Sequence, residues 1–120
     1  KTLHVVILNP NSGLPLYEET WGEPITEESR PYGKIANAKA ELVYKTGMVG
    51  RSLQADAPWL YETGDVRYAG GVIENQLIVA ASGLQDYWDE AISWMVLSAV
   101  QGLCRGFMAG VKREDPAFFQ

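Results

Sequence analysis

The side chains of this 120-residue sequence that could carry acid–base or nucleophilic chemistry are few and scattered. The one histidine, His4, stands near the start of an apolar stretch, where a histidine is more often structural than catalytic. The one cysteine, Cys104, lies in an apolar helical stretch, which predicts a buried and inert thiol. The carboxylates of Asp86, Asp89 and Glu90 could supply a base, but acids at a helix start usually interact with the helix dipole. We therefore assign no catalytic residue.

Spacings typical of metal, phosphate and triad sites are absent from the sequence. It contains no paired histidines, no cysteine pair, no His-Glu-x-x-His, no Gly-x-Ser-x-Gly elbow and no phosphate-binding glycine loop. Axial heme ligation most often uses His, Cys, Met or Tyr, and His4 is poorly placed for it in a strand. We predict no metal site, name no cofactor, and leave open whether heme is bound or a reaction catalysed.

A ligand pocket is best sought between two glycine-containing pairs and a lysine. Gly70-Gly71 interrupts a predicted strand, which marks a bulge or the close approach of another backbone or a ligand. Ser82-Gly83 precedes a predicted helix, whose first N–H groups would favour an anionic group that Lys39 could neutralise. Tyr68 could add an aromatic wall. A solvated lysine with purely structural glycines is the alternative. The predicted ligand-binding residues are Lys39, Tyr68, Gly70, Gly71, Ser82 and Gly83.

Composition and charge limit the class of protein. With 47% hydrophobic and 21% charged residues, the chain is typical of one globular domain that buries its own core. Its net charge of −5 argues against a nucleic-acid partner, which would need a basic patch. We see no apolar run long enough to span a membrane and no signal-peptide pattern. We therefore expect no membrane partner and a cytoplasmic location.

Two hairpins and two helices are expected to position the pocket residues. The apolar, β-branched stretches predict strands, Ser29 and Gly47 bracket the first helix as N-cap and C′ residues, and Ser82 with Gln85 fits a capping box. A tight turn is expected at Glu74-Asn75. In order, we expect strands at 3–8 and 14–17, a loop at 18–28, a helix at about 30–46, an irregular segment at 49–63, strands at 66–73 and 76–81, and a helix at about 84–107. This order predicts a single α+β domain over residues 1–110, followed by a tail at 111–120.

The last helix is apolar on more than one face. A core stripe is expected at helical spacing, made of Ile92, Val96, Ala99, Val100, Leu103 and Phe107. Trp94 and Leu97 then face outward, and leaving them in water forgoes roughly 2 kcal/mol each. We predict self-association, or docking on another subunit, through Trp94, Leu97 and the tail residues Phe118 and Phe119.

Three short motifs, in this order, resemble the GlcG/HbpS-like family, whose fold is profilin-like. They are Ala36-Asn37-Ala38-Lys39-Ala40, Gly70-Gly71-Val72-Ile73, and Ala81-Ser82-Gly83-Leu84 with Asp89-Glu90-Ala91. Residues 5–13 are similar to the family's first strand and turn. The resemblance implies a profilin-like antiparallel sheet with two long helices, and a small or planar ligand bound within a ring-like oligomer. Its departures are the lack of the family's first helix before Leu3, the missing proline of the Gly-Gly-Val-Pro-Ile motif, and a shorter hairpin.

Three functions are compatible with these features. The leading one is a non-enzymatic small-molecule-binding or assembly protein of the GlcG/HbpS-like type, with an unknown ligand. The second is an enzyme acting on a small carboxylated or carbonyl metabolite, with Lys39 and an acidic residue of the last helix as acid and base. The third is a structural or interaction subunit whose pocket is degenerate.

Overall fold

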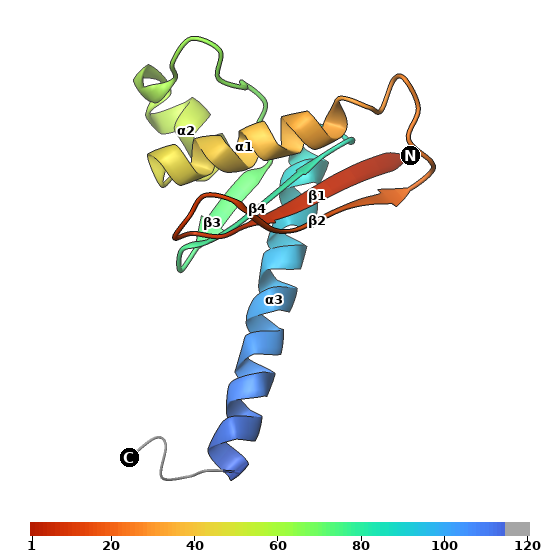
Figure 1. Cartoon of the computed structure of the whole chain (residues 1–120). Coiled ribbons are helices and arrows are strands. Elements are labelled where there is room, and N and C mark those ends of the chain that lie inside the picture. The colour runs from red at the N-terminus through yellow and green to blue at the C-terminus, as the bar shows by residue number, and fades with distance from the viewer. Residues whose placement is uncertain (115–120) are drawn as a thin grey trace.

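A computed structural model describes residues 1–114 as a four-stranded antiparallel sheet with helices on both of its faces (Figure 1). This confirms the predicted α+β class with an antiparallel sheet and two long helices. The elements are β1 (Thr2–Leu8), β2 (Pro15–Gly22), α1 (Tyr32–Thr46), α2 (Gly50–Asp56), the short 3-10 helix η1 (Pro58–Leu60), β3 (Gly71–Glu74), β4 (Leu77–Ser82) and α3 (Asp86–Glu114).

The sheet consists of two hairpins that meet at its centre. Its strand order is β2-β1-β4-β3, and all neighbouring strands are antiparallel. The β3–β4 turn holds Asn75 at φ 50° and Gln76 at φ 69°, one residue later than predicted. Two successive residues with positive φ match the twist of a two-residue hairpin, and asparagine tolerates that conformation well. β3 is much shorter than the strand expected at 66–73.

Each face of the sheet buries its own apolar layer. On one face, α1 packs on β1 and β4 through Ala36, Ala40 and Val43. On the other face, α3 packs on β4 and β3, with Leu97 completely buried. α1 ends as predicted, because Gly47 adopts φ 70° and donates its N–H to the Val43 carbonyl.

Several boundaries differ from the sequence-based expectation. β2 continues to Gly22, so part of the acidic stretch expected as a loop forms an edge strand, and Trp21 packs against the core. Residues 49–63 include α2 and η1. Pro31 occupies the N-cap of α1, whereas the Ser29 hydroxyl accepts a hydrogen bond from the Thr26 N–H in the preceding turn. The segment 111–114, placed in a tail, belongs to α3.

The buried stripe of α3 was predicted correctly only in its first part, where Ile92 and Val96 pack against the core layer. Leu97 is buried rather than outward-facing, and Trp94 is partly buried against the same core layer. Leu103 is 75% exposed and Phe107 70% exposed, although both were assigned to the core. The helix is longer than the sheet, so a residue can lie on the sheet-facing side and still find no sheet beneath it. For the same reason Cys104, predicted to be buried, is exposed. Phe118 and Phe119 lie outside the described residues.

The C-terminal part of α3 extends well beyond the sheet (Figure 1). It gives the described chain principal extents of 51 × 37 × 23 Å. By length and composition this 29-residue helix could cross a membrane, contrary to the expectation from sequence, and most of the qualifying stretch is exposed. One such helix does not distinguish a membrane span from a helix of a soluble protein.

Candidate functional site

A buried ion pair joins the two long helices. The Lys39 ammonium on α1 lies 2.9 Å from a carboxylate oxygen of Asp89 on α3, and both side chains are 3% exposed. Lys39 also donates to the Ala81 carbonyl on β4, at 3.0 Å. A lysine has three donors and needs partners for them when it leaves water. Two of the three are therefore used within the fold, which leaves little of the ammonium for an outside anion.

Asp89 also organises the start of α3. Its second carboxylate oxygen accepts the Leu84 N–H at 3.0 Å. Burial has the largest effect on the Asp89 carboxyl, and its pKa is raised. The hydrogen bond and charge of Lys39, and the backbone N–H groups of Leu84 and Gly83, act in the opposite direction but do not outweigh burial. The backbone N–H groups expected to hold an anionic ligand are thus partly occupied by a carboxylate of the protein itself.

The glycine pair allows the elements around this ion pair to approach closely. A Cβ at Gly70 would lie 2.9 Å from the Lys39 Nζ, and Gly70 adopts φ 138°, which glycine tolerates best. A Cβ at Gly71 would lie 2.7 Å from a methyl carbon of Val43 and 3.0 Å from the Lys39 carbonyl oxygen. Of the roles considered for this pair, the structure selects close approach of another backbone, that of α1. Neither glycine lines the pocket described next.

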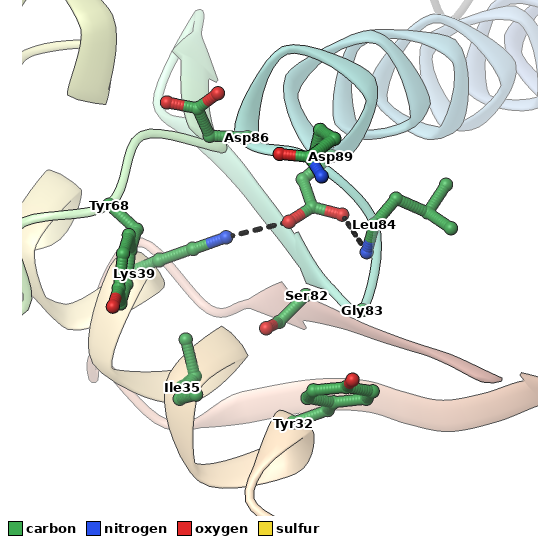
Figure 2. A pocket seen from close by; sticks show the side chains of 10 residues that line it. Tyr32, Ile35, Lys39, Tyr68, Ser82, Gly83, Leu84, Asp86 and Asp89 are labelled. Carbon is green, nitrogen blue, oxygen red and sulfur yellow. Dashed lines mark hydrogen bonds and ion pairs between the residues drawn. The ribbon is translucent and has the colours of Figure 1, made fainter. Parts of the chain in front are cut away.

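An open pocket of about 450 Å³ lies beside the ion pair (Figure 2). Figure 2 shows Lys39 and Asp89 pointing toward one another, with the Ser82 side chain nearby. The ring of Tyr32 comes from the start of α1, and the ring of Tyr68 comes from the segment before β3. Its lining residues are Tyr32, Ile35, Lys39, Tyr68, Ser82, Gly83, Leu84, Gln85, Asp86 and Asp89. The volume is in the range of small-molecule sites, and the mixture of aromatic, aliphatic and polar groups is typical of them.

Four of the six predicted residues line this pocket, namely Lys39, Tyr68, Ser82 and Gly83. Sequence reasoning missed Tyr32 and Ile35, which α1 brings to the opposite side. It named Asp89 as a helix-start acid and a possible base, but did not include it among the ligand-binding residues. A usable signal was present: Asp89 and Ser93 are polar residues four positions apart on an otherwise apolar helix face, a spacing that places both toward the core.

His4 is held by hydrogen bonds within the sheet and lies outside the pocket. Its Nδ1 lies 2.9 Å from the Thr20 hydroxyl, and its Nε2 lies 2.8 Å from a Glu18 carboxylate oxygen. Both ring nitrogens are thus engaged, which fits the structural role expected for this histidine. Among residues 1–114, no group of three or more His, Cys, Asp or Glu side chains is arranged to hold a metal ion.

Comparison with known proteins finds a solved structure with a similar fold. No family model matches the sequence, and a search of curated proteins gives no match. The crystal structure of the Klebsiella pneumoniae protein ORFY, a DUF336 protein, superposes with a TM-score of 0.61 at 16% sequence identity. The match covers 81% of this chain and 73% of ORFY. The chain therefore shares its α+β fold with a DUF336 protein.

Proposed function

We propose that the chain is a GlcG-like, small-molecule-binding protein whose ligand occupies the pocket beside Lys39 and Asp89. The observation that carries the proposal is this pocket of about 450 Å³, in which two tyrosines and Ile35 surround a small set of polar groups. The shared fold with ORFY and the motifs at 36–40, 70–73 and 81–84 support the family. The cytoplasmic location remains part of the proposal.

The charges around the pocket favour a neutral or cationic ligand over the anionic one first expected. Lys39 is offset by Asp89 at 2.9 Å, so the pair contributes little net charge. Asp86 then adds a negative charge to the lining. Tyr32 and Tyr68 provide aromatic faces that attract planar rings and cations. We therefore propose a small planar ligand with a hydrogen-bonding or amino group as the class of occupant.

The buried ion pair is better suited to shaping a binding pocket than to acid–base catalysis. A general acid or base must reach the substrate, whereas both members of the pair are 3% exposed and already bonded to each other. Removing the Lys39–Asp89 ion pair should therefore alter both the stability of the fold and the shape of the pocket. The enzyme alternative would require Lys39 to be released from Asp89 and the Ala81 carbonyl first.

Thermal-shift titration with a panel of small compounds tests the proposal. The panel holds planar amines, neutral heteroaromatics and matched carboxylates, and each hit is measured by calorimetry. We expect saturable binding of an amine or a neutral heteroaromatic compound. Tyr68→Ala should weaken it by about 1 kcal/mol, the usual worth of an aromatic contact. Tyr68 is 65% exposed, so this substitution leaves the core intact.

The matched control is Trp59→Ala, because Trp59 on η1 is an aromatic residue at least as exposed as Tyr68 and does not line the pocket. It should leave the binding constant unchanged. Equal losses of affinity in Tyr68→Ala and Trp59→Ala would contradict the proposed site. Tighter binding of the carboxylate than of its amine or neutral counterpart in every matched pair would contradict the proposed ligand charge.

A further inference from the structure

The hydroxyl group of Ser82 has no hydrogen-bond partner within residues 1–114, although the residue is only 4% exposed. The other polar and charged side chains buried in this part of the chain all form hydrogen bonds. They are Thr2, Ser29, Lys39, Asp89 and Ser93. Buried polar groups in proteins are almost always paired, so an exception needs an explanation. Ser82 differs from the other buried serines in that it lines the pocket beside the ion pair.

The Ser82 hydroxyl faces this pocket (Figure 2). Among residues 1–114, every side-chain oxygen or nitrogen atom that is completely cut off from the surface has a partner. The unpaired Ser82 oxygen is therefore still accessible, and the pocket is the open space that its residue lines. Figure 2 shows the oxygen directed toward the space between Lys39 and Ile35. A molecule in the pocket can thus reach it.

Lys39 offers a second hydrogen-bond donor at the same end of β4. Its ammonium has three N–H groups, and two of them bond to the Ala81 carbonyl and to Asp89. Ala81 directly precedes Ser82 in β4, so its bond to Lys39 holds the ammonium next to the serine. The third N–H has no partner within residues 1–114, and Lys39 lines the pocket. Two donors that the fold leaves unused therefore lie together at one side of the pocket.

A neutral carbonyl oxygen is the group that both donors can share. A lysine ammonium only donates, whereas a serine hydroxyl donates or accepts, so the shared group must be an acceptor. A carbonyl oxygen has two lone pairs and can accept from both donors. A carboxylate would bring a charge that Lys39 already balances with Asp89 at 2.9 Å, and a cation would lie against the ammonium. A neutral acceptor avoids both costs.

We propose that Ser82 selects a planar amide as the ligand of this pocket, whose carbonyl oxygen accepts hydrogen bonds from the Ser82 hydroxyl and the Lys39 ammonium. The inference rests on the proposed binding function and adds the group by which the ligand is recognised. An amide also carries N–H donors beside its carbonyl, and Asp86 in the lining supplies an acceptor for them. Its planar ring packs against Tyr32 and Tyr68, which line the same pocket.

Three compounds of nearly the same planar shape test this assignment. Benzamide has a neutral carbonyl, benzamidine is a cation in which a nitrogen donor replaces that oxygen, and benzoate is an anion. Each is titrated into the ¹⁵N-labelled full chain, and the backbone amide signals are followed by NMR. We expect benzamide to bind roughly tenfold more tightly than either of the other two compounds. It should also shift the signals of Ser82 and Gly83.

Ser82→Ala removes the donor without leaving any group of the described fold unpaired. We expect this variant to keep the urea midpoint of the parent, to bind benzamide roughly fivefold to tenfold more weakly and to bind benzamidine unchanged. Ser93→Ala is the matched control, because Ser93 is a buried serine that bonds to the Gly70 carbonyl and does not line the pocket. It should retain the preference for benzamide over benzamidine.

The outcomes separate this inference from the proposed function. If planar compounds bind at a site that Tyr68→Ala weakens, but benzamide binds no more tightly than benzamidine and benzoate, the binding function stands and the amide assignment is overturned. If no planar compound binds, both are overturned. A clear loss of stability in Ser82→Ala, or an equal loss of the benzamide preference in Ser82→Ala and Ser93→Ala, also overturns the assignment. The ranking of the three compounds on the unmodified chain depends on neither variant.

Discussion

The hydroxyl of Ser93 on α3 donates a hydrogen bond to the carbonyl of Gly70 at 2.7 Å, and both groups are buried. The same oxygen lies 2.9 Å from the Asp89 carbonyl one turn earlier in the helix. Ser93 therefore connects α3 to the irregular segment that enters β3, directly beside the Lys39–Asp89 pair. It is a polar residue at a position that an apolar side chain would otherwise occupy.

Ser93→Ala removes the donor and leaves the Gly70 carbonyl buried without its partner. We expect the free energy of unfolding to fall by about 1–3 kcal/mol, the cost of an unsatisfied buried polar group. Ser98→Ala, on the exposed side of the same helix, should change it by less than about 0.5 kcal/mol. Urea denaturation of both variants measures the difference, and equal effects would show that the Ser93 bond contributes nothing specific.

Breaking the Lys39–Asp89 pair should be more costly than replacing it. Lys39→Met and Asp89→Asn each leave one buried charge alone, and we expect each to cost about 3–5 kcal/mol. The double variant Lys39→Met/Asp89→Asn leaves neither charge, so it should cost clearly less than the two single losses added together. Arg30→Met, which breaks an exposed pair with Glu27, is the control and should cost at most about 1 kcal/mol. If the loss of unfolding free energy in the double variant equals the sum of the two single losses, Lys39 and Asp89 are not coupled.

Adding a methyl group at Gly71 should destabilise the fold by overpacking. Its Cβ would lie 2.7 Å from the Val43 side chain and 3.0 Å from a backbone oxygen of α1. We expect Gly71→Ala to lower the free energy of unfolding by about 1–3 kcal/mol. Gly110→Ala, in a helix with room for the new atom, should raise it by about 0.5–1 kcal/mol through helix propensity. Thermal unfolding of the two variants should therefore shift in opposite directions.

Stability at mildly acidic pH should depend on Glu18. Burial by itself would raise the pKa of Glu18, but hydrogen bonds from Asn37 and His4, together with the charge of His4, outweigh it and lower the pKa. A lowered folded-state pKa contributes stability above the unfolded value of about 4.3, and this contribution is lost as pH falls through the folded pKa. Glu18→Gln should thus be less stable than the parent near about pH 6 and converge with it near about pH 3. A difference in urea midpoint that stays constant over this range would contradict the assignment.

The sequence predicted the elements whose signals are local. The β-branched strands, the asparagine in the second hairpin and Gly47 at the end of α1 each act within a few residues, and all three are found. The pocket was predicted in part, because Lys39, Tyr68, Ser82 and Gly83 do line it together.

What could not be predicted depends on distances between elements. Helical periodicity gives the angular position of Leu103 on α3, but not where the sheet beneath it ends, so an exposed residue was assigned to the core. Lys39 and Asp89 are 50 positions apart, and their pairing depends on how α1 and α3 lie against opposite faces of one sheet. Glycine spacing indicated a close approach at Gly71 without identifying α1 as its partner.

The strand order has a consequence for how the chain folds. β1 pairs with β2 through a short turn, and β3 pairs with β4 through a tight one, so both hairpins can form from local contacts. The β1–β4 pairing, in contrast, joins His4 to Ser82 across most of the domain. During synthesis, one edge of β1 therefore stays unpaired until β4 has left the ribosome. The other edge of this hairpin is β2, which contains Glu18 and Glu19 and is followed directly by Glu23, and these charges would keep that edge from pairing with other nascent chains.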